Sequence, residues 1–317
     1  MYFRDTVHSP EEWLSYERTR NQLAVFVGDC VGFLGDAMAA VDQSPAVKKC
    51  FSHGTIVALL RHQLAATDGI AILVSEGCAE MCPTLLRGAF EAELGISFIL
   101  QKESRRRGLA YQVADIHRRI NLYRSLSPQD EMNRQLRSQL RRDPLVDLLD
   151  AGEVDVADKA AKLEAALCND DYRPIEKEWQ AMRIKKNGRK STPAWYSLFS
   201  GPRSIEDLAR RVDQGALYAV VYRLWSGVVH GSSAFENFGP GDEPSGVAVR
   251  PLRHPAGLEL ACTYAGQFAL MAAHSVVAAY APEQIPLFRR VYAERISSRY
   301  LMVSKGGLIN SPWKGSS

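Results

Sequence analysis

Apolar residues recur at helical spacing along most of the chain, whereas the alternation typical of a half-buried strand is almost absent. Proline, glycine and helix-capping side chains set the expected boundaries. We expect helices over 10–44, 46–66, 84–100, 105–142, 156–167, 218–231, 257–280 and 282–300, a third apolar stretch from Gly69 to Pro83, a short helix from Ser204, and a short strand within 246–252. The pattern predicts an all-α fold.

These elements predict one helical bundle. We expect a single domain over 1–303, in which the helices within 10–66 pack on a core over 70–303. A long loop rich in Gly and Pro, about 236–257, interrupts the C-terminal third, and residues 304–317 are expected to form a flexible tail.

The helix over 84–100 is apolar on almost every side, so we expect it at the centre of the core. It carries Arg87 and Glu91, four positions apart. A buried charge needs a partner, because an unpaired buried ion costs several kcal/mol. We interpret the two residues as an internal ion pair that helps to hold the helices together.

The composition is that of an ordinary globular protein, with 46% hydrophobic and 24% charged residues. The net charge of +3 is too small to indicate nucleic-acid binding by itself, so an anionic partner has to bind a local basic surface. The most apolar stretch, 55–74, contains Arg61, His62 and Asp68, and the N-terminus lacks a signal-peptide pattern. We expect a cytoplasmic protein that does not bind membranes.

Several common chemical signatures are missing. The chain has no Walker loop, no dinucleotide fingerprint after a strand, no His-Glu-x-x-His and no Gly-x-Ser-x-Gly. Cys78 and Cys82 share a helical face, but two thiols without a second pair make a poor zinc site. We therefore expect neither a metal nor a cofactor.

Two segments are strongly basic. The helical region 105–142 is interpreted as a solvated face. For the loop 183–190, a solvated loop and a surface that follows RNA phosphates both remain open. In the second case the RNA-binding residues are Lys185, Lys186, Arg189 and Lys190.

The segment from Tyr218 to Gly231 places an Arg and a His on one face of an apolar helix. Arg223 and His230 are seven positions apart, so at about 100° per residue their side chains point within roughly 20° of each other. Between them, Ser226 and Gly227 are small and leave room above the helix.

This pair has the chemistry to cleave RNA without a metal. A neutral imidazole accepts a proton near pH 7, and a guanidinium binds phosphate oxygens and stays charged. His230 would remove the proton of a ribose 2′-hydroxyl, and Arg223 would stabilise the transition state that leads to a 2′,3′-cyclic phosphate. A structural alternative pairs Arg223 with Glu91 and His230 with the helix C-terminus.

The Arg-x6-His spacing of Arg223 and His230 resembles the Arg-x4-6-His motif of the HEPN superfamily (higher eukaryotes and prokaryotes nucleotide-binding). Leu86-Arg87-Gly88-Ala89-Phe90-Glu91, together with Tyr218-x3-Tyr222-Arg223-x2-Ser226-x3-His230-Gly231, is also similar to an uncharacterised bacterial family. That similarity covers roughly residues 80–235.

The resemblance implies an all-helical fold with a HEPN-like core, Arg223 and His230 as the catalytic pair, and Arg87, Glu91, Tyr222 and Ser226 as supporting residues. It further implies a homodimer with both Arg-His pairs on one groove, and an antitoxin or defence-system partner. Superfamily members often have a polar residue after the Arg, where this chain has Leu224.

Two functions are compatible with the sequence. The first is a metal-independent endoribonuclease of a bacterial defence or toxin type, with RNA as its substrate. The alternative is a non-catalytic HEPN-like module that binds a nucleotide or a protein partner. A transcriptional regulator is less favoured, because no helix-turn-helix with an exposed recognition helix is found.

Overall fold

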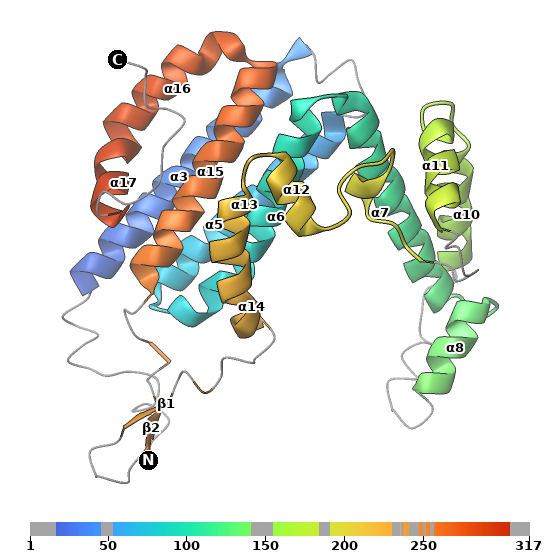
Figure 1. Ribbon diagram of the computed structural model, residues 1–317, viewed down its shortest axis with the longest axis horizontal. Coiled ribbons are helices and arrows are strands. Elements are labelled where there is room, and N and C mark those ends of the chain that lie inside the picture. Colours follow the sequence, from blue (N-terminus) through green and yellow to red (C-terminus); the bar gives the residue numbers. More distant parts are fainter. Residues whose placement is uncertain are drawn as a thin grey trace. The chain divides into compact units, whose positions relative to one another are not determined.

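The computed structural model is nearly all helical (Figure 1). It describes residues 17–45, 53–140, 155–183, 191–229 and 257–304, with 235, 238–240, 247–249, 252 and 253 from the segment between the last two ranges. The predicted all-α class is confirmed. The expected strand is β2 (Val247–Val249), which pairs antiparallel with β1 (Phe238–Pro240).

Contacts concentrate in two compact units, one formed by residues 1–102 with 205–317 and the other by 103–204. This division into compact units does not test the expected single domain over 1–303, which stays a prediction. The candidate site residues that the structure describes all belong to the first unit, which is described first.

Four long helices form the core of the first unit, and each packs on at least two of the others. They are α3 (Glu17–Gln43), α5 (Gly54–Ser75), α6 (Cys82–Gln101) and α15 (Leu258–Tyr280). As expected from its apolar surface, α6 is central: it contacts α5 and α15 as well as the two short helices α12 (Ile205–Arg211) and α14 (Arg223–Val229). Phe90 of α6 is fully buried against Phe268 of α15, with ring centroids 5.1 Å apart.

The small residues of α15 allow close packing, as its sequence predicts. A Cβ added at Gly266 would lie 2.5 Å from Cζ of Phe26 in α3. Phe26 is fully buried and its ring centroid is 5.9 Å from that of Tyr300, so the ring has little freedom to move away. The α3–α15 contact therefore depends on the missing side chain.

The expected break between residues 66 and 69 is wrong, because α5 continues to Ser75. Thr67 bonds through its hydroxyl to the carbonyl of Gln63, 2.9 Å away, which is compatible with a continuous helix. Gly69 is used for packing and does not end the helix: an added Cβ would come within 2.8 Å of Leu85 in α6.

The C-terminal elements complete this unit. After α15 come η6 (Pro282–Gln284), α16 (Ile285–Val291), the π-helical turn η7 (Tyr292–Ile296) and α17 (Ser297–Ser304), which together account for the expected helix over 282–300. Figure 1 shows α16 and α17 beside α3 and α15, and α17 contacts both of those long helices. Residues 305–317, most of the expected tail, lie outside the described residues.

Three described helices are long and apolar enough to cross a membrane by length and composition, namely α3, α5 and α15. All three pack on one another in the four-helix core. Charged side chains interrupt α3 and α5, whereas the only charged residue of α15 is Glu259 in its first turn.

The second unit has its own core. It contains α7 (Ser104–Leu126), α8 (Glu131–Gln139), α10 (Val156–Leu167), α11 (Arg173–Arg183) and η3 (Trp195–Ser197). Val113 of α7 and Trp179 of α11 are among its buried residues. His117 stacks on Trp179 with centroids 4.9 Å apart, and its Nε2 lies 2.7 Å from a carboxylate oxygen of Glu176.

Many arginines of the basic region 105–142 have acidic partners within this unit. Arg105 pairs with Asp171 at 2.6 Å and Arg124 with Glu164 at 2.7 Å, and further pairs join residues three apart on one helix. Much of the positive charge is therefore neutralised locally, as on an ordinary solvated face.

Candidate active site

The segment that carries Arg223 is helical but not uniformly α-helical. After α12 (Ile205–Arg211), α13 (Gly215–Leu217) leads into a π-helical turn, η4 (Tyr218–Tyr222), and then into α14 (Arg223–Val229). The sequence predicts an uninterrupted α-helix over 218–231. A π-helical turn holds one more residue between its hydrogen-bonded groups, so residues beyond it are displaced around the helix axis relative to residues before it.

The π-helical turn brings Tyr222 to α6, which α14 also contacts (Figure 1). The Tyr222 hydroxyl donates to Oε1 of Glu91 at 3.0 Å and accepts a hydrogen bond from Nη2 of Arg87. The Arg87 guanidinium carbon lies 4.2 Å from the centroid of the Tyr222 ring, within the range of a cation–π contact. Tyr222 therefore joins both charged residues.

Arg87 and Glu91 form the ion pair that the sequence predicts. Nε of Arg87 is 3.3 Å from Oε1 of Glu91, and the two side chains are 25% and 41% exposed. The pair is thus open to solvent rather than sealed in the core. Its contribution to stability is correspondingly modest.

The electrostatics of this cluster keep the phenol protonated. Burial, followed by the Glu91 carboxylate, raises the pKa of Tyr222 to about 12. Burial acts against the charged form of Arg87, but its hydrogen bond to Glu91 and the neighbouring Tyr222 raise the Arg87 pKa above its ordinary value. At neutral pH Tyr222 is therefore a hydrogen-bond donor to Glu91 and Arg87 a permanent cation.

Arg223, the next residue along the chain, points to a different partner. Its Nη2 lies 3.4 Å from Oε1 of Glu206, in the first turn of α12, and its side chain is 65% exposed. Glu206 also pairs with Arg210. Among the described residues, Arg223 therefore pairs with Glu206 and not with Glu91. The structural alternative considered from the sequence pairs Arg223 with Glu91.

Sequence reasoning misses Glu206. The run from Ser204 to Asp207 indicates the start of a helix, and acidic residues are common there because they favour the helix dipole. No signal in the sequence distinguishes a carboxylate with that role from one that also reaches an arginine 17 residues later.

The other predicted site residues divide into two groups. Ser226 is described as part of α14, three residues after Arg223. The residues outside the described part of the chain are His230, Lys185, Lys186, Arg189 and Lys190. The structure thus brings Arg87, Glu91 and Tyr222 into contact, with Arg223 adjacent in the chain.

No group of three or more His, Cys, Asp or Glu side chains suited to a metal occurs among the described residues. Cys82 is buried, its thiol donates to the Cys78 carbonyl at 3.5 Å, and burial raises its pKa to about 12. A thiol with that pKa is protonated at neutral pH, so Cys82 is a poor ligand in this conformation.

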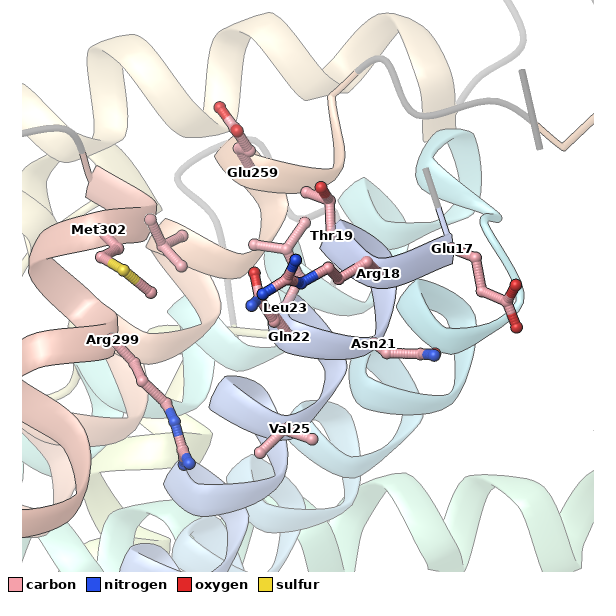
Figure 2. Close-up of a pocket in the computed structure, with 11 residues that line it drawn as sticks. Glu17, Arg18, Thr19, Asn21, Gln22, Leu23, Val25, Glu259, Arg299 and Met302 are labelled. Carbon is pink, nitrogen blue, oxygen red and sulfur yellow. The ribbon is translucent and has the colours of Figure 1, made fainter. Parts of the chain in front are cut away.

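A separate pocket of about 800 Å³ lies where the start of α3, the start of α15 and the end of α17 meet (Figure 2). Its described lining carries Arg18 and Arg299 but also Glu17 and Glu259, and Arg299 pairs with Asp29. None of the candidate site residues is among that lining. The mixed charges favour no particular class of ligand.

The comparisons with known proteins identify a family. A model described as a family of unknown function, DUF5677, matches residues 53–244, more than half of the chain. The chain belongs to this family. The DUF5677 match contains α6 with Arg87 and Glu91, the whole segment from Tyr218 to Gly231, and Glu206. No curated protein and no solved structure matches the chain.

Proposed function

We propose that this DUF5677 member is a metal-independent endoribonuclease with a HEPN-like core elaborated by the Gly/Pro-rich loop 236–257. It acts in the cytoplasm as a homodimer, with RNA as its substrate, in bacterial defence or as a toxin that an antitoxin or defence-system partner controls. The observation that carries the proposal is the exposed guanidinium of Arg223 at the first residue of α14, next to the Arg87–Tyr222–Glu91 cluster.

Arg223 has the properties that phosphate binding requires. Its side chain is 65% exposed, and its salt bridge with Glu206 at 3.4 Å is long and open to solvent. Such a pair is worth at most about 1 kcal/mol, so a phosphate in the same place competes with it at little cost. The guanidinium then stabilises the negative charge that develops on the phosphate oxygens.

His230 is the proposed general base. It removes the proton of a ribose 2′-hydroxyl, and the 2′-oxygen attacks the adjacent phosphorus. The bond from phosphorus to the 5′-oxygen of the next nucleotide breaks, that oxygen takes a proton from water, and His230 returns its proton to the solvent. The products are a 2′,3′-cyclic phosphate and a 5′-hydroxyl. Metal ligands are not needed, because Arg223 supplies the positive charge and His230 accepts the proton.

In this proposal Arg87, Glu91 and Tyr222 act as supports. Tyr222 immediately precedes Arg223, and two hydrogen bonds hold its hydroxyl on α6. Fixing Tyr222 fixes the backbone from which Arg223 projects. Ser226, three residues later on α14, is the remaining supporting residue.

One observation favours the alternative, a non-catalytic module that binds a nucleotide or protein partner. The Arg223 guanidinium already forms an ion pair with Glu206. A module in which Arg223 serves only to join α12 to α14 would form the same pair. The two functions differ in whether removing Arg223 abolishes a reaction or only loosens α12.

The test is RNA cleavage in excess EDTA by wild-type protein, Arg223→Ala and His230→Ala. Arg210→Ala is the matched control, because Arg210 binds the same Glu206 and is similarly exposed. We expect each site variant to lose about 100-fold or more in rate, and the control to stay within about threefold of wild type. Equal cleavage by all four proteins, or none by folded wild type, contradicts the proposal.

A further inference from the structure

Two tyrosines and an arginine form a stacked group at the π-helical turn. The rings of Tyr218 and Tyr222 are nearly parallel, with an interplanar angle of 21° and centroids 4.8 Å apart. Arg87 lies against the ring of Tyr222, 4.2 Å from its centroid. Tyr218 is partly exposed, as is the side chain of Arg87.

The π-helical turn lies between Tyr218 and Arg223. In an α-helix, residues five apart are separated by about 140° around the axis. A π-helical turn holds one more residue than an α-helical turn, which reduces the angle around the axis between residues five apart. Tyr218 and Arg223 are five apart, and η4 is the turn between them. Tyr218 thus lies one turn before Arg223, and its stacking partner is Tyr222, the residue that immediately precedes Arg223.

Tyr222 makes this arrangement rigid. Its hydroxyl is held by Arg87 and Glu91, so the ring on which Tyr218 stacks cannot rotate freely. A ring supported on one face, partly exposed and one turn from a phosphate-binding cation is suited to stacking with a nucleobase. Such stacking is tolerant of sequence, because every base presents a π face.

We propose that Tyr218 is a stacking platform for one base of a single-stranded RNA whose neighbouring phosphate binds Arg223. This inference rests on the proposed function, since it uses the same substrate and the same arginine. It adds that the substrate is unpaired at the cleavage site: a base within a duplex is already stacked on its neighbours and cannot lie on Tyr218. A single-stranded segment or loop is therefore the preferred substrate.

The test measures binding by the full chain carrying His230→Ala, which is not expected to cleave the probe. The probes are a fluorescein-labelled single-stranded A12 RNA and a ribose-phosphate 12-mer of equal charge without bases, compared by fluorescence anisotropy. The variants are Tyr218→Ala, Tyr218→Phe and Val220→Ala. Val220 is the matched control, because it is a 47% exposed apolar residue on the same turn. Circular dichroism melts establish that each variant is folded.

We expect Tyr218→Ala to weaken A12 binding by about 5- to 100-fold and to leave binding of the abasic strand unchanged. Tyr218→Phe, which keeps the ring, should restore A12 binding to within about twofold of the parent, and Val220→Ala should match the parent. Three results each overturn the platform: no effect of Tyr218→Ala, an equal loss for both probes, or no measurable A12 binding by the parent.

The two proposals fail differently. If wild type cleaves RNA and Tyr218→Ala binds A12 as well as the parent does, the platform is wrong and the reaction stands. If wild type does not cleave RNA in EDTA but A12 binding depends on Tyr218, the reaction is wrong and the chain is a module that binds single-stranded RNA.

Discussion

Replacing Glu93 with glutamine should stabilise the protein, and increasingly so as the pH rises. Glu93 lies on α6 with no exposed surface, and Ser97 Oγ donates to its Oε1 at 2.7 Å. Burial raises its pKa to about 7, against the opposing effect of hydrogen bonds from Ser97 and Gln214. Its Oε2 and the Gln214 Oε1 are buried acceptors without a hydrogen-bond donor in the described part of the chain. A protonated carboxyl supplies such a donor.

The number of protons bound by the native and unfolded states decides how the free energy of unfolding depends on pH. The folded pKa exceeds the ordinary value of 4.5, so between those values the native state binds more protons than the unfolded state. The free energy of unfolding of wild type therefore falls as the pH rises from about 4.5 to about 7, and levels off above that. A shift of this size corresponds to about 3 kcal/mol, whereas the amide introduced by Glu93→Gln does not titrate.

Urea unfolding followed by circular dichroism measures the effect. The unfolding free energies of wild type and Glu93→Gln are compared at pH 5 and pH 8, and their difference removes the titration of groups common to both. We expect the variant to gain about 2–3 kcal/mol on wild type between these pH values. A difference in unfolding free energy that does not change with pH would refute the buried neutral carboxyl. So would a variant that becomes less stable relative to wild type as the pH rises.

Three further predictions concern stability. Gly266→Ala should lower the unfolding free energy by about 1–3 kcal/mol, because its Cβ meets the buried Phe26 ring. Gly28→Ala is the control: its Cβ has nothing within 4 Å, so the unfolding free energy should stay the same or rise by up to about 1 kcal/mol. Equal thermal melts of the two variants would contradict the α3–α15 packing. Tyr222→Phe removes both hydroxyl hydrogen bonds but keeps the ring, so chemical denaturation should show a loss of about 1–2 kcal/mol, and an unchanged value would contradict the bridge. Arg223→Ala breaks only an exposed pair, so its melting temperature should fall by no more than about 3 °C, and a larger fall would favour the structural role.

The sequence predicts the helices well where their apolar pattern is long and their ends are marked. Residues 84–100 are expected to form one helix after Pro83, and α6 spans Cys82–Gln101. The expected helix over 257–280 is α15, with Gly257 in the left-handed conformation immediately before it. The failure at Gly69 has a packing cause, because a glycine that ends a helix and one that admits a neighbouring helix look the same in a sequence.

The site is predictable only in part. The Arg87–Glu91 pair follows from spacing on one helix, but its bridge to Tyr222 depends on how α14 packs on α6. The π-helical turn before Arg223 has no sequence signature, so the position of Tyr218 relative to Arg223 does not follow from α-helical spacing. Spacing alone also does not show that Glu93, two positions after Glu91, is the more deeply buried carboxyl, because α6 is apolar on almost every side.

The central claim, cleavage through the ribose 2′-hydroxyl, is tested most directly by the products from a defined single-stranded RNA. Wild-type protein is incubated in EDTA with that RNA and with a copy whose cleaved nucleotide is 2′-deoxy, and the fragments are analysed by mass spectrometry. We expect a 2′,3′-cyclic phosphate and a 5′-hydroxyl from the first RNA and no cleavage at that position in the second. Cleavage of the deoxy-substituted strand, or 5′-phosphate products, would contradict it.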